Sequence, residues 1–570
     1  MPTAYEKERA ANIARNKALL EKLDLKNAAA DLAPPKPPKK QAKPVQANKP
    51  KKQNAPPEAR RQSARLRNAV DLSDLSPAKR KRVEAEREEA RAKQEEDRLE
   101  AEEKERAAKR PRHDDLTLAT LAEDEDGEDL TALSALFETT AQSARRGARD
   151  EDTYQSDEET EDDKFVAELR EKVADLKIAS RAKVTQNRIY SAAYHPDVSK
   201  DLVFFGDKHG SLGIWDARAP VDEVEDEDGD VAPVNGSEGK SWNLQLHWPA
   251  TSKSSISCVK IDPTNSHNIY TSAYDCTIRA TSFPAGVSRE VFATDDVLIS
   301  SLDVAPNGTD MWVADGMGGV WHRDLRQDKT VAVRYGLSDQ KIGCVSVNSS
   351  RPHFLVTSSN SRSLKIWDVR KLQNVLNGDT PPTPPPSSPG GPFLAPVSTA
   401  NLEAEFDTVV QYAASKKGKG ALRADWRHDK SVSSAYWDPR GRYVVSTSYD
   451  DTLRLWDISP ANMEASAPFP SSRPFGRIRH NCQTGKWLTI LRAQWSPNPD
   501  VYPHFTIGNM DHSLNVFSCK GELIARLADS SKITAVQAVT ASHPTIVERA
   551  VSGNGSGRCV LWAPAEEEES

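Results

Sequence analysis

Short apolar runs recur along the C-terminal two-thirds of the chain, and each run ends near a proline or glycine. Each is followed by a second apolar run, a polar turn and a third run, as in YVVSTSYDDTLRLWDIS (443–459). Runs of this kind, bounded by turn residues, predict β-strands. The first run of each unit is RIYSAAYHP (188–196), SISCVKIDP (255–263), ISSLDVAPNG (299–308), IGCVSVNSSRP (342–352), SVSSAYWDPRG (431–441), LRAQWSPNP (491–499) and KITAVQAVTASHP (532–544).

These units repeat with a regular period when they are aligned on the Trp of a terminal Trp-Asp pair. The aligned positions are Trp215, Thr281, Arg323, Trp367, Trp456, Phe517 and Trp562. The uninterrupted spacings of 42, 44 and 45 residues match the blade period of WD-repeat propellers. Seven four-stranded sheets that stack on one another can close into a ring. The sequence therefore predicts an all-β, seven-bladed WD-repeat β-propeller over residues 188–564, with the Trp-Asp pairs structural.

Two features at the ends of the repeat region concern how the ring closes. The seventh unit stops soon after Trp562, before a fourth strand can form. We expect the segment at about 181–186 to supply that strand, within a helix-and-strand segment at 164–187, because this pairing removes an exposed sheet edge. Residues 565–570 form an acidic tail. The longer spacings are assigned to insertions at 219–243, 373–425 and 460–487.

The segment before the repeats has a different composition. Residues 1–112 contain no Trp, Phe or Cys, too little apolar surface to offset chain entropy. Residues 36–82 hold 15 Lys and Arg against 3 Asp and Glu, whereas residues 113–163 hold 18 acidic residues against 3 basic ones. We expect 31–163 to be a disordered arm, first basic and then acidic. Its basic clusters suit nuclear import and loose phosphate contact, or else they merely solubilise the chain.

A short helix is predicted near the N-terminus, within a docking segment at 1–30. Ile13, Leu20 and Leu23 lie on one apolar stripe of an otherwise charged rod, and an isolated helix of this length is marginal in water. The stripe indicates that the helix docks on a partner protein. The alternative is a fraying helix without a partner.

Several function classes lack any signature in the sequence. The six cysteines form no CxxC pair and no Cys/His metal spacing, so we expect reduced thiols and no structural zinc or other cofactor. No signal sequence or apolar window of membrane-spanning length occurs, and we expect no membrane partner. P-loop, GxSxG and HExxH motifs are absent. We therefore expect a non-catalytic protein without a small-molecule substrate.

Several local strings resemble known families. KSSISCVKIDPTNSHNIYTSAYDCTIRATSF (253–283), VFATDDVLISSLDVAP (291–306) and KIWDVRKL (365–372) resemble the small subunit of the UV-damaged DNA-binding complex and its WD-repeat relatives. YEKERAANIARNKALLEKLDL (5–25) and RRQSARLR (60–67) are similar to the fungal damage-binding "changed mutation rate" family, related to WD repeat-containing protein 76. The resemblance implies nuclear DNA binding in the damage response, with a preference for UV-damaged DNA, double- and single-stranded.

The resemblance also implies a DNA-facing set of residues. Relatives wedge a hairpin into the duplex, and the corresponding string here is RHNCQTGKWLTILRAQW (479–495), with Gly485, Lys486 and Trp487 at its tip. The relatives' aromatic-polar-His tip is missing. An indole can still stack on an opened base step, and a Lys can reach a phosphate; alternatively, Trp487 packs inside blade six. The other cations that align with DNA-facing loops are Lys208, Lys253, Lys341, Arg479 and Arg492.

An Asp-x-Arg pattern ends three of the repeats and supports a second hypothesis. The pairs are Asp216/Arg218, Asp324/Arg326 and Asp368/Arg370. In propellers that act as receptors for cullin-type ubiquitin ligases, such pairs in neighbouring blades dock on the adaptor subunit. The alternative function is therefore a WD-repeat scaffold, a ligase substrate receptor or a hub for chromatin proteins, unless each Arg serves its own blade.

Overall fold

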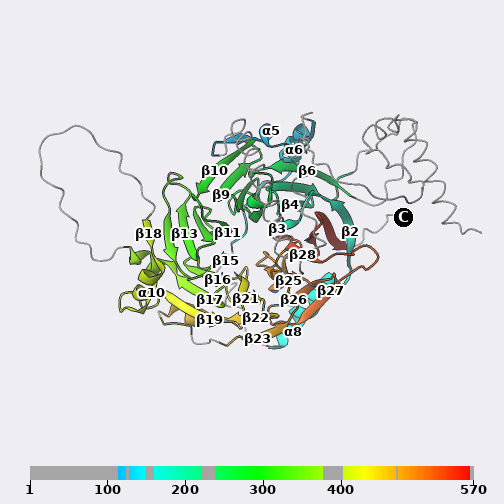
Figure 1. Ribbon diagram of the computed structural model, residues 1–570. Helices are drawn as coiled ribbons and strands as arrows, with labels where there is room; N and C mark the ends of the chain where they lie inside the picture. Colours follow the sequence, from blue (N-terminus) through cyan, green and yellow to red (C-terminus); the bar gives the residue numbers. More distant parts are fainter. Residues whose placement is uncertain are drawn as a thin grey trace, which may run out of the picture. The chain divides into compact units, whose positions relative to one another are not determined.

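The computed structural model describes residues 113–122, 128–147, 159–220, 238–376, 402–465, 467–469 and 473–564. Within them, seven β-sheets are arranged around a common axis (Figure 1). The predicted seven-bladed propeller is confirmed. The docking segment at 1–30 with Ile13, Leu20 and Leu23, the basic part of the arm and the tail at 565–570 lie outside the described residues.

The first three blades are built from consecutive strands. Blade one contains β3 (Ile189–Tyr194), β4 (Leu202–Asp207), β5 (Ser211–Asp216) and β6 (Lys240–Gln245). Blade two contains β7 (Ile256–Ile261), β8 (Asn268–Ala273), β9 (Thr277–Ser282) and β10 (Val287–Ala293). Blade three contains β11 (Ile299–Val304), β12 (Asp310–Asp315), β13 (Gly319–Asp324) and β14 (Val333–Gly336), to which β18 (Leu402–Ala404) adds in parallel.

The remaining blades continue the same order. Blade four contains β15 (Ile342–Val347), β16 (Phe354–Ser359), β17 (Ser363–Asp368) and β19 (Leu422–Arg427). Blade five contains β20 (Val432–Trp437), β21 (Tyr443–Ser448), β22 (Thr452–Asp457) and β23 (Gly476–Arg479). Blade six contains β24 (Gln494–Trp495), β25 (His504–Gly508), β26 (Leu514–Ser518) and β27 (Leu523–Leu527), and blade seven begins with β28 (Gln537–Ser542), β29 (Ala550–Asn554) and β30 (Arg558–Pro564).

Ring closure comes from β2 (Leu176–Lys183), the fourth strand of blade seven. It pairs antiparallel with β30, in register from Leu176↔Pro564 to Lys183↔Arg558. The closing strand was predicted correctly, but it begins five residues earlier than the expected 181–186. The helix before it, α8 (Glu159–Ala174), packs Leu169 and Val173 against blades six and seven.

Strand direction sorts the connections onto two faces of the propeller. Because neighbouring strands within a blade are antiparallel, the turn between the second and third strands lies at the end where the innermost strand begins. The connection from each outer strand to the next blade lies at the same end. We call this side the start face and the opposite side the end face.

Stacking of the blades buries both surfaces of the inner strands. Six-residue strands such as β4, β5 and β16 are buried at every position, which explains their near-continuous apolar runs. The Trp residues of the repeat ends fill the gaps between sheets: Trp215, Trp367, Trp456 and Trp562 are fully buried. Trp456 of blade five also stacks on Trp426 of β19, the outer strand of blade four, at 4.7 Å between ring centroids. Their burial between neighbouring sheets agrees with the structural role predicted for these residues.

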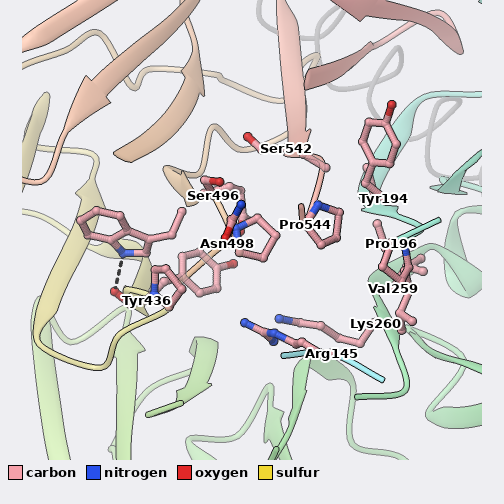
Figure 2. A pocket seen from close by; sticks show the side chains of 18 of the residues that line it. Arg145, Tyr194, Pro196, Val259, Lys260, Tyr436, Ser496, Asn498, Ser542 and Pro544 are labelled. Carbon is pink, nitrogen blue, oxygen red and sulfur yellow. Dashed lines mark hydrogen bonds between the residues drawn. The ribbon is translucent and has the colours of Figure 1, made fainter. Parts of the chain in front are cut away.

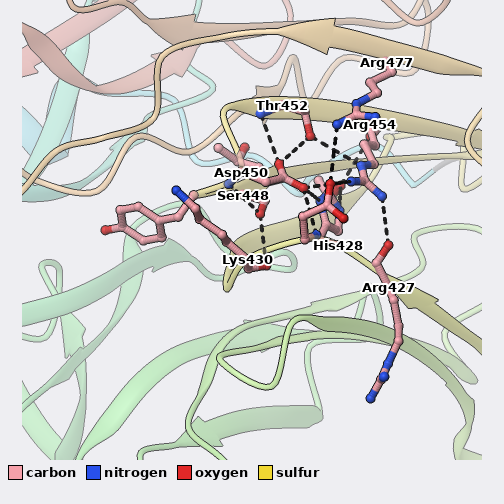
Figure 3. A network of polar contacts seen from close by, with 12 residues as sticks. Arg427, His428, Lys430, Ser448, Asp450, Thr452, Arg454 and Arg477 are labelled. Atoms are coloured by element: carbon pink, nitrogen blue, oxygen red, sulfur yellow. Dashed lines mark hydrogen bonds and ion pairs between the residues drawn. The ribbon is translucent and has the colours of Figure 1, made fainter.

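Buried polar groups hold the start-face turns in place, as blade five illustrates (Figure 3). His428 Nδ1 lies 3.0 Å from Asp450 Oδ2, and His428 Nε2 lies 2.9 Å from Ser446 Oγ. Arg454 donates to the same Asp450 carboxylate at 2.8 Å and to the carbonyl of Arg427 at 2.8 Å. The network ties the connection between blades four and five to the inner sheet.

The arm expected to be disordered over 113–163 contains ordered elements, so that expectation is wrong for part of the range. β1 (Leu116–Thr117) adds a fifth strand to blade two, and α5 (Leu118–Leu121) and α6 (Glu128–Thr139) follow it. The acidic composition concealed an apolar face that packs against blades one and two: Leu116, Leu118, Leu121, Leu133, Leu136 and Phe137.

The predicted insertion ranges also need correction. Each of them includes part of an outer strand: β6 begins inside 219–243, β19 inside 373–425, and β23 inside 460–487. These strands carry the polar sequences KSWNLQ, LRADWR and GRIR. An outer strand is only half-buried, so it lacks the apolar run that marks inner strands. The second range also contains α10 (Phe406–Ala414), and the third contains α11 (Pro460–Glu464).

Substitution of Phe137 tests whether the arm is part of the folded body. Phe137 is buried and stacks on Phe283 at 4.0 Å between ring centroids. Phe137→Ala is expected to lower the free energy of unfolding by about 3–5 kcal/mol, measured by chemical denaturation. Val198→Ala, at an exposed side chain of blade one, is the control and is expected to change it by less than about 0.5 kcal/mol. Equal, small effects of both would contradict the packing of α6.

Acid sensitivity is expected from the buried imidazole of blade five. Burial lowers the pKa of His428 to about 4, whereas an unfolded chain protonates histidine near 6.5. The unfolded state therefore binds more protons between these pH values, and each unit of falling pH removes up to about 1.4 kcal/mol of stability. Melting temperatures between pH 6.5 and 4 are expected to fall less steeply for His428→Gln than for the unmodified chain. Parallel profiles would contradict this role.

Candidate nucleic-acid interface

Lys208 and Lys253, which come from different blades, lie close together on the start face. The backbone N–H of Lys208 donates to the carbonyl of Arg188 at 2.8 Å. Ser255 Oγ donates to the carbonyls of Lys208 at 2.7 Å and of Ser252 at 2.9 Å. The turn of blade one that contains Lys208 is thus joined to the connection that carries exposed Lys253.

Lys341 joins this group through blade two. The backbone N–H of Tyr274 donates to the Ser255 carbonyl at 3.0 Å, and the Lys341 ammonium lies 5.1 Å from the centroid of the Tyr274 ring. A cation at this distance is attracted by the ring quadrupole. Lys208, Lys253 and Lys341 therefore line one part of the start face, as the matched loops predicted.

Backbone contacts continue around the start face from blade four to blade six. The N–H of Asn360 donates to the Lys341 carbonyl at 2.9 Å, and Ser431 Oγ donates to the Asn360 carbonyl at 3.2 Å. The N–H of Tyr449 donates to the Ser431 carbonyl at 3.0 Å, and Gln483 Nε2 donates to the Tyr449 carbonyl at 2.6 Å. The start-face loops thus support one another.

The segment aligned with the relatives' wedge is an irregular loop, not a hairpin. Between β23 and β24, residues 480–493 form no paired strands. Both sides of its tip are nevertheless anchored: Cys482 N–H donates to Asp451 Oδ1 at 3.0 Å, and Thr489 Oγ1 donates to the carbonyl of Ile189. The tip is held rigidly although it lacks a sheet.

Lys486 and Trp487 project from this anchored loop. The guanidinium of Arg188 donates to the Lys486 carbonyl at 3.2 Å, which places the loop beside Lys208. Trp487 is 82% exposed, so it does not pack inside blade six. Gly485 has φ +58° with open space around its Cα, a conformation that glycine adopts without strain. The tip presents a cation and an indole to solvent.

Two further predicted DNA contacts lie elsewhere. Arg479 is exposed at the end of β23, the outer strand of blade five, so it lies at the periphery of the start face. Arg492 does not lie on the rim: it lines the central channel, whose lining also includes Tyr436 and Cys258. The expectation of a DNA-facing Arg492 is therefore not supported by its position.

A register shift at the start of the inner strand recurs in the blades other than blade six, where Arg492 precedes the paired residues of β24. In six blades, the pairing of the first two strands skips one residue near the start of the inner strand, as between Ile189 and Ser191 or between Ile256 and Cys258. Such a β-bulge redirects the extra side chain, and Tyr190 and Ser257 at these positions line the channel. Arg492 follows buried Leu491 just as Ser257 follows buried Ile256.

Arg188 is a member of the start-face group that the sequence pattern did not single out. It lies between the two loops that carry Lys208 and Lys486 and contacts the backbone of both. Its position immediately before the first strand of blade one matches that of Lys341 before the first strand of blade four. A search for cations immediately before inner strands would therefore have found Arg188 as well as Lys341.

The Asp-x-Arg pairs lie on the end face, because they follow third strands. Arg326 donates to both oxygens of Asp324 at 2.9 and 2.8 Å, and Arg370 does the same to Asp368 at 3.0 and 2.7 Å. These hydrogen bonds lower the pKa of Asp324. Each Arg thus pairs within its own blade, yet the Arg326 and Arg370 side chains remain 70% and 61% exposed.

The first Asp-x-Arg pair is arranged differently. The Arg218 guanidinium contacts Asp201 at 2.7 Å, and Arg549 of blade seven contacts the same carboxylate at 2.9 Å. Asp201 is fully buried. This pair therefore belongs to the junction between blades one and seven. The same Asp-x-Arg motif thus forms an ion pair within one blade in two cases and a contact between blades in the third.

The cysteines and histidines of the described ranges form no metal centre. Among those residues, all six cysteines are free thiols, and His, Cys, Asp and Glu side chains form no group of three or more arranged to hold a metal ion. No helix in the same residues combines the length and apolar character needed to cross a membrane.

Known proteins match the chain over most of its length. The family described as WD domain, G-beta repeat matches residues 330–368 and 422–457. DNA damage-binding protein CMR1 of Cryptococcus neoformans var. neoformans serotype D is 39% identical over 455 residues, 74% of each chain. The protein of that name from Mycosarcoma maydis is 32% identical over 98% of this chain and 99% of its own. The Aspergillus clavatus protein is 32% identical over 98% of both chains.

Proposed function

Because the chain belongs to the fungal family of DNA damage-binding protein CMR1, we propose that it binds damaged DNA through the start face of its propeller. The observation that carries the proposal is the anchored loop at 480–493, which holds Trp487 exposed beside Lys486. We further propose a nuclear role in the DNA damage response, by binding rather than catalysis.

The cations of the start face suit the backbone of a duplex. Lys208, Lys253, Lys341 and Lys486 come from different parts of the ring and are joined by the contacts through Arg188, Ser255 and Tyr274. Neutralising a phosphate releases condensed counterions, so contacts of this kind give affinity that falls steeply with salt. They position the protein without distinguishing one base sequence from another.

Trp487 supplies the preference for damage in this proposal. Tryptophan has a large apolar ring with a polar N–H, and it is enriched at interaction surfaces. A lesion weakens stacking and pairing, so opening the duplex there costs less than at an intact step. An indole held on a rigid loop then stacks on the opened base step. This mechanism suits UV-damaged duplex and also accommodates single strands.

The end face supports a second candidate function, docking on a ubiquitin-ligase adaptor or a chromatin protein. Arg326 and Arg370 are each fixed by two hydrogen bonds and exposed on neighbouring blades. A fixed guanidinium loses little side-chain entropy when it meets a partner. Since the two faces are opposite, this function is compatible with DNA binding.

Charge reversal on the start face tests the proposed interface. Lys341→Glu combined with Lys486→Glu is expected to weaken duplex binding and to reduce the salt slope by about one for each phosphate that is no longer neutralised. Fluorescence anisotropy across a salt series measures both quantities. The matched control is Lys416→Glu with Lys419→Glu, at two exposed lysines in the connection between the third and fourth strands of blade four. Unchanged binding by the start-face variant would exclude this surface.

Replacement of the indole separates damage recognition from general affinity. Trp487→Ala is expected to lose about 1–3 kcal/mol of binding to UV-irradiated duplex and little binding to intact duplex. Trp487→Phe retains a stacking surface and is expected to recover part of the preference. The measurement is the ratio of the two dissociation constants at one salt concentration. A ratio that stays constant in Trp487→Ala would assign lesion preference to another part of the chain.

A further inference from the structure

A cavity of about 660 Å³ occupies the axis of the propeller. Its lining comes from the inner strands of all seven blades, from connections on the end face such as Pro196, Pro306 and Pro439, and from residues 143–146 of the arm. Figure 2 shows Arg145 and Lys260 side by side, pointing into this cavity. The volume lies in the range of small-molecule sites.

Five cationic side chains line the cavity. Arg146 pairs with Asp500, and Lys172 pairs with Glu168. The other three come from distant parts of the chain: Arg145 of the arm, Lys260 of blade two and Arg492 of blade six. Lys260 Nζ pairs with Asp303 Oδ1 at 3.0 Å, and this carboxylate also accepts from the N–H of Val347. Within the described part of the chain, no hydrogen bond or ion pair satisfies the guanidinium of Arg145 or Arg492. The cavity therefore has more positive charge than its nearest carboxylate balances.

The other carboxylates of the lining are engaged elsewhere. Asp262 accepts from the N–H and hydroxyl of Thr264, and Asp500 pairs with Arg146. Glu548 interacts with Lys172 at the edge of the cavity. None of these groups neutralises Arg145 or Arg492.

The backbone around Arg145 is fixed by hydrogen bonds to blade two. Its backbone N–H donates to the carbonyl of Pro263 at 2.7 Å, and the N–H of Ser143 donates to Ser266 Oγ at 3.0 Å. The main chain is thus fixed to blade two, while the side chain extends toward the axis. The guanidinium is therefore held where it can contact a ligand in the cavity.

Hydroxyl groups in the lining also lack partners among the described residues. Ser496 Oγ and Ser143 Oγ are buried without a hydrogen bond, and both residues line the cavity. Because these two oxygen atoms have almost no accessible surface, they do not face the cavity, and contact with an anion is left to the cationic side chains. Arginine forks match the oxygens of a phosphate group in particular.

We propose that the central cavity binds a small free polyanion with phosphate groups, held by Arg145, Lys260 and Arg492. The inner strands of the blades surround the site laterally, and a cavity of about 660 Å³ is too small for a duplex. This site is separate from the start-face DNA interface and does not depend on the proposed function. Because Arg145 belongs to the arm, a bound anion also stabilises the seating of residues 128–147 on the propeller.

Calorimetric titration of the full-length chain with inorganic tripolyphosphate tests the proposal. Binding with one site per chain is expected, with a higher melting temperature in the presence of the anion. Arg145→Gln and Arg492→Gln are each expected to weaken binding about tenfold. Lys486→Gln, on the start face, is the control and is expected to leave the affinity unchanged. Citrate, which carries carboxylates in place of phosphates, is expected to bind more weakly.

Three results would overturn the proposal: no binding of tripolyphosphate, equal affinity in Arg145→Gln and the unmodified chain, or equal affinity for citrate. Binding of UV-irradiated duplex by Arg145→Gln is measured in parallel and is expected to be unchanged. Failure of the cavity site and failure of the DNA interface therefore give different results.

Discussion

The pairing of β2 with β30 is the contact on which the rest of the propeller depends. A strand that precedes blade one completes blade seven, so that residues nearly 400 positions apart share one ladder. Without this pairing, blade seven would present an open edge and the first and last blades could separate. Arg188 lies five residues after β2, and its contacts hold the loop at 480–493. Ring closure therefore also positions the start-face residues.

The start face combines rigidity with exposure. Its loops are joined from blade one to blade six by hydrogen bonds to backbone carbonyls and by the contact of Lys341 with the Tyr274 ring, and the buried side chains of His428 and Asp450 support them. Trp487 takes no part in this network, and it is the most exposed of the large hydrophobic side chains in the described residues. A surface of this kind meets a ligand without first paying the entropy of ordering its loops.

The sequence revealed the features that depend on repetition. Seven apolar runs and the spacing of 42 to 45 residues between uninterrupted units predicted the blades, and the truncated seventh unit predicted the closing strand. Polar outer strands such as β19 and β23 escaped detection because half of each strand faces solvent. The ordered arm was hidden because acidic residues outnumber the few apolar ones, such as Phe137, that pack against the blades. The composition of a segment does not show whether its few apolar side chains pack against another part of the protein.

The candidate site was only partly predictable for a related reason. Lys208, Lys341 and Lys486 were selected from the resemblance to DNA-binding relatives, and strand direction places their loops on one face. Arg492 lies in the unpaired segment before β24 and lines the axis, and the sequence pattern of the repeat does not show that orientation. That Trp487 is exposed depends on anchors at Asp451 and Ile189, both far from the loop in sequence.

The recurrent bulge has a wider consequence for how such a molecule can change. Each bulged residue stands outside the hydrogen-bonded ladder, so its side chain can be exchanged while the sheet keeps its pairing. Tyr190 and Ser257 are two such positions, in blades one and two, and both line the axis. The chemistry of the axis can diversify one position at a time, independently of the surfaces on either side of the ring.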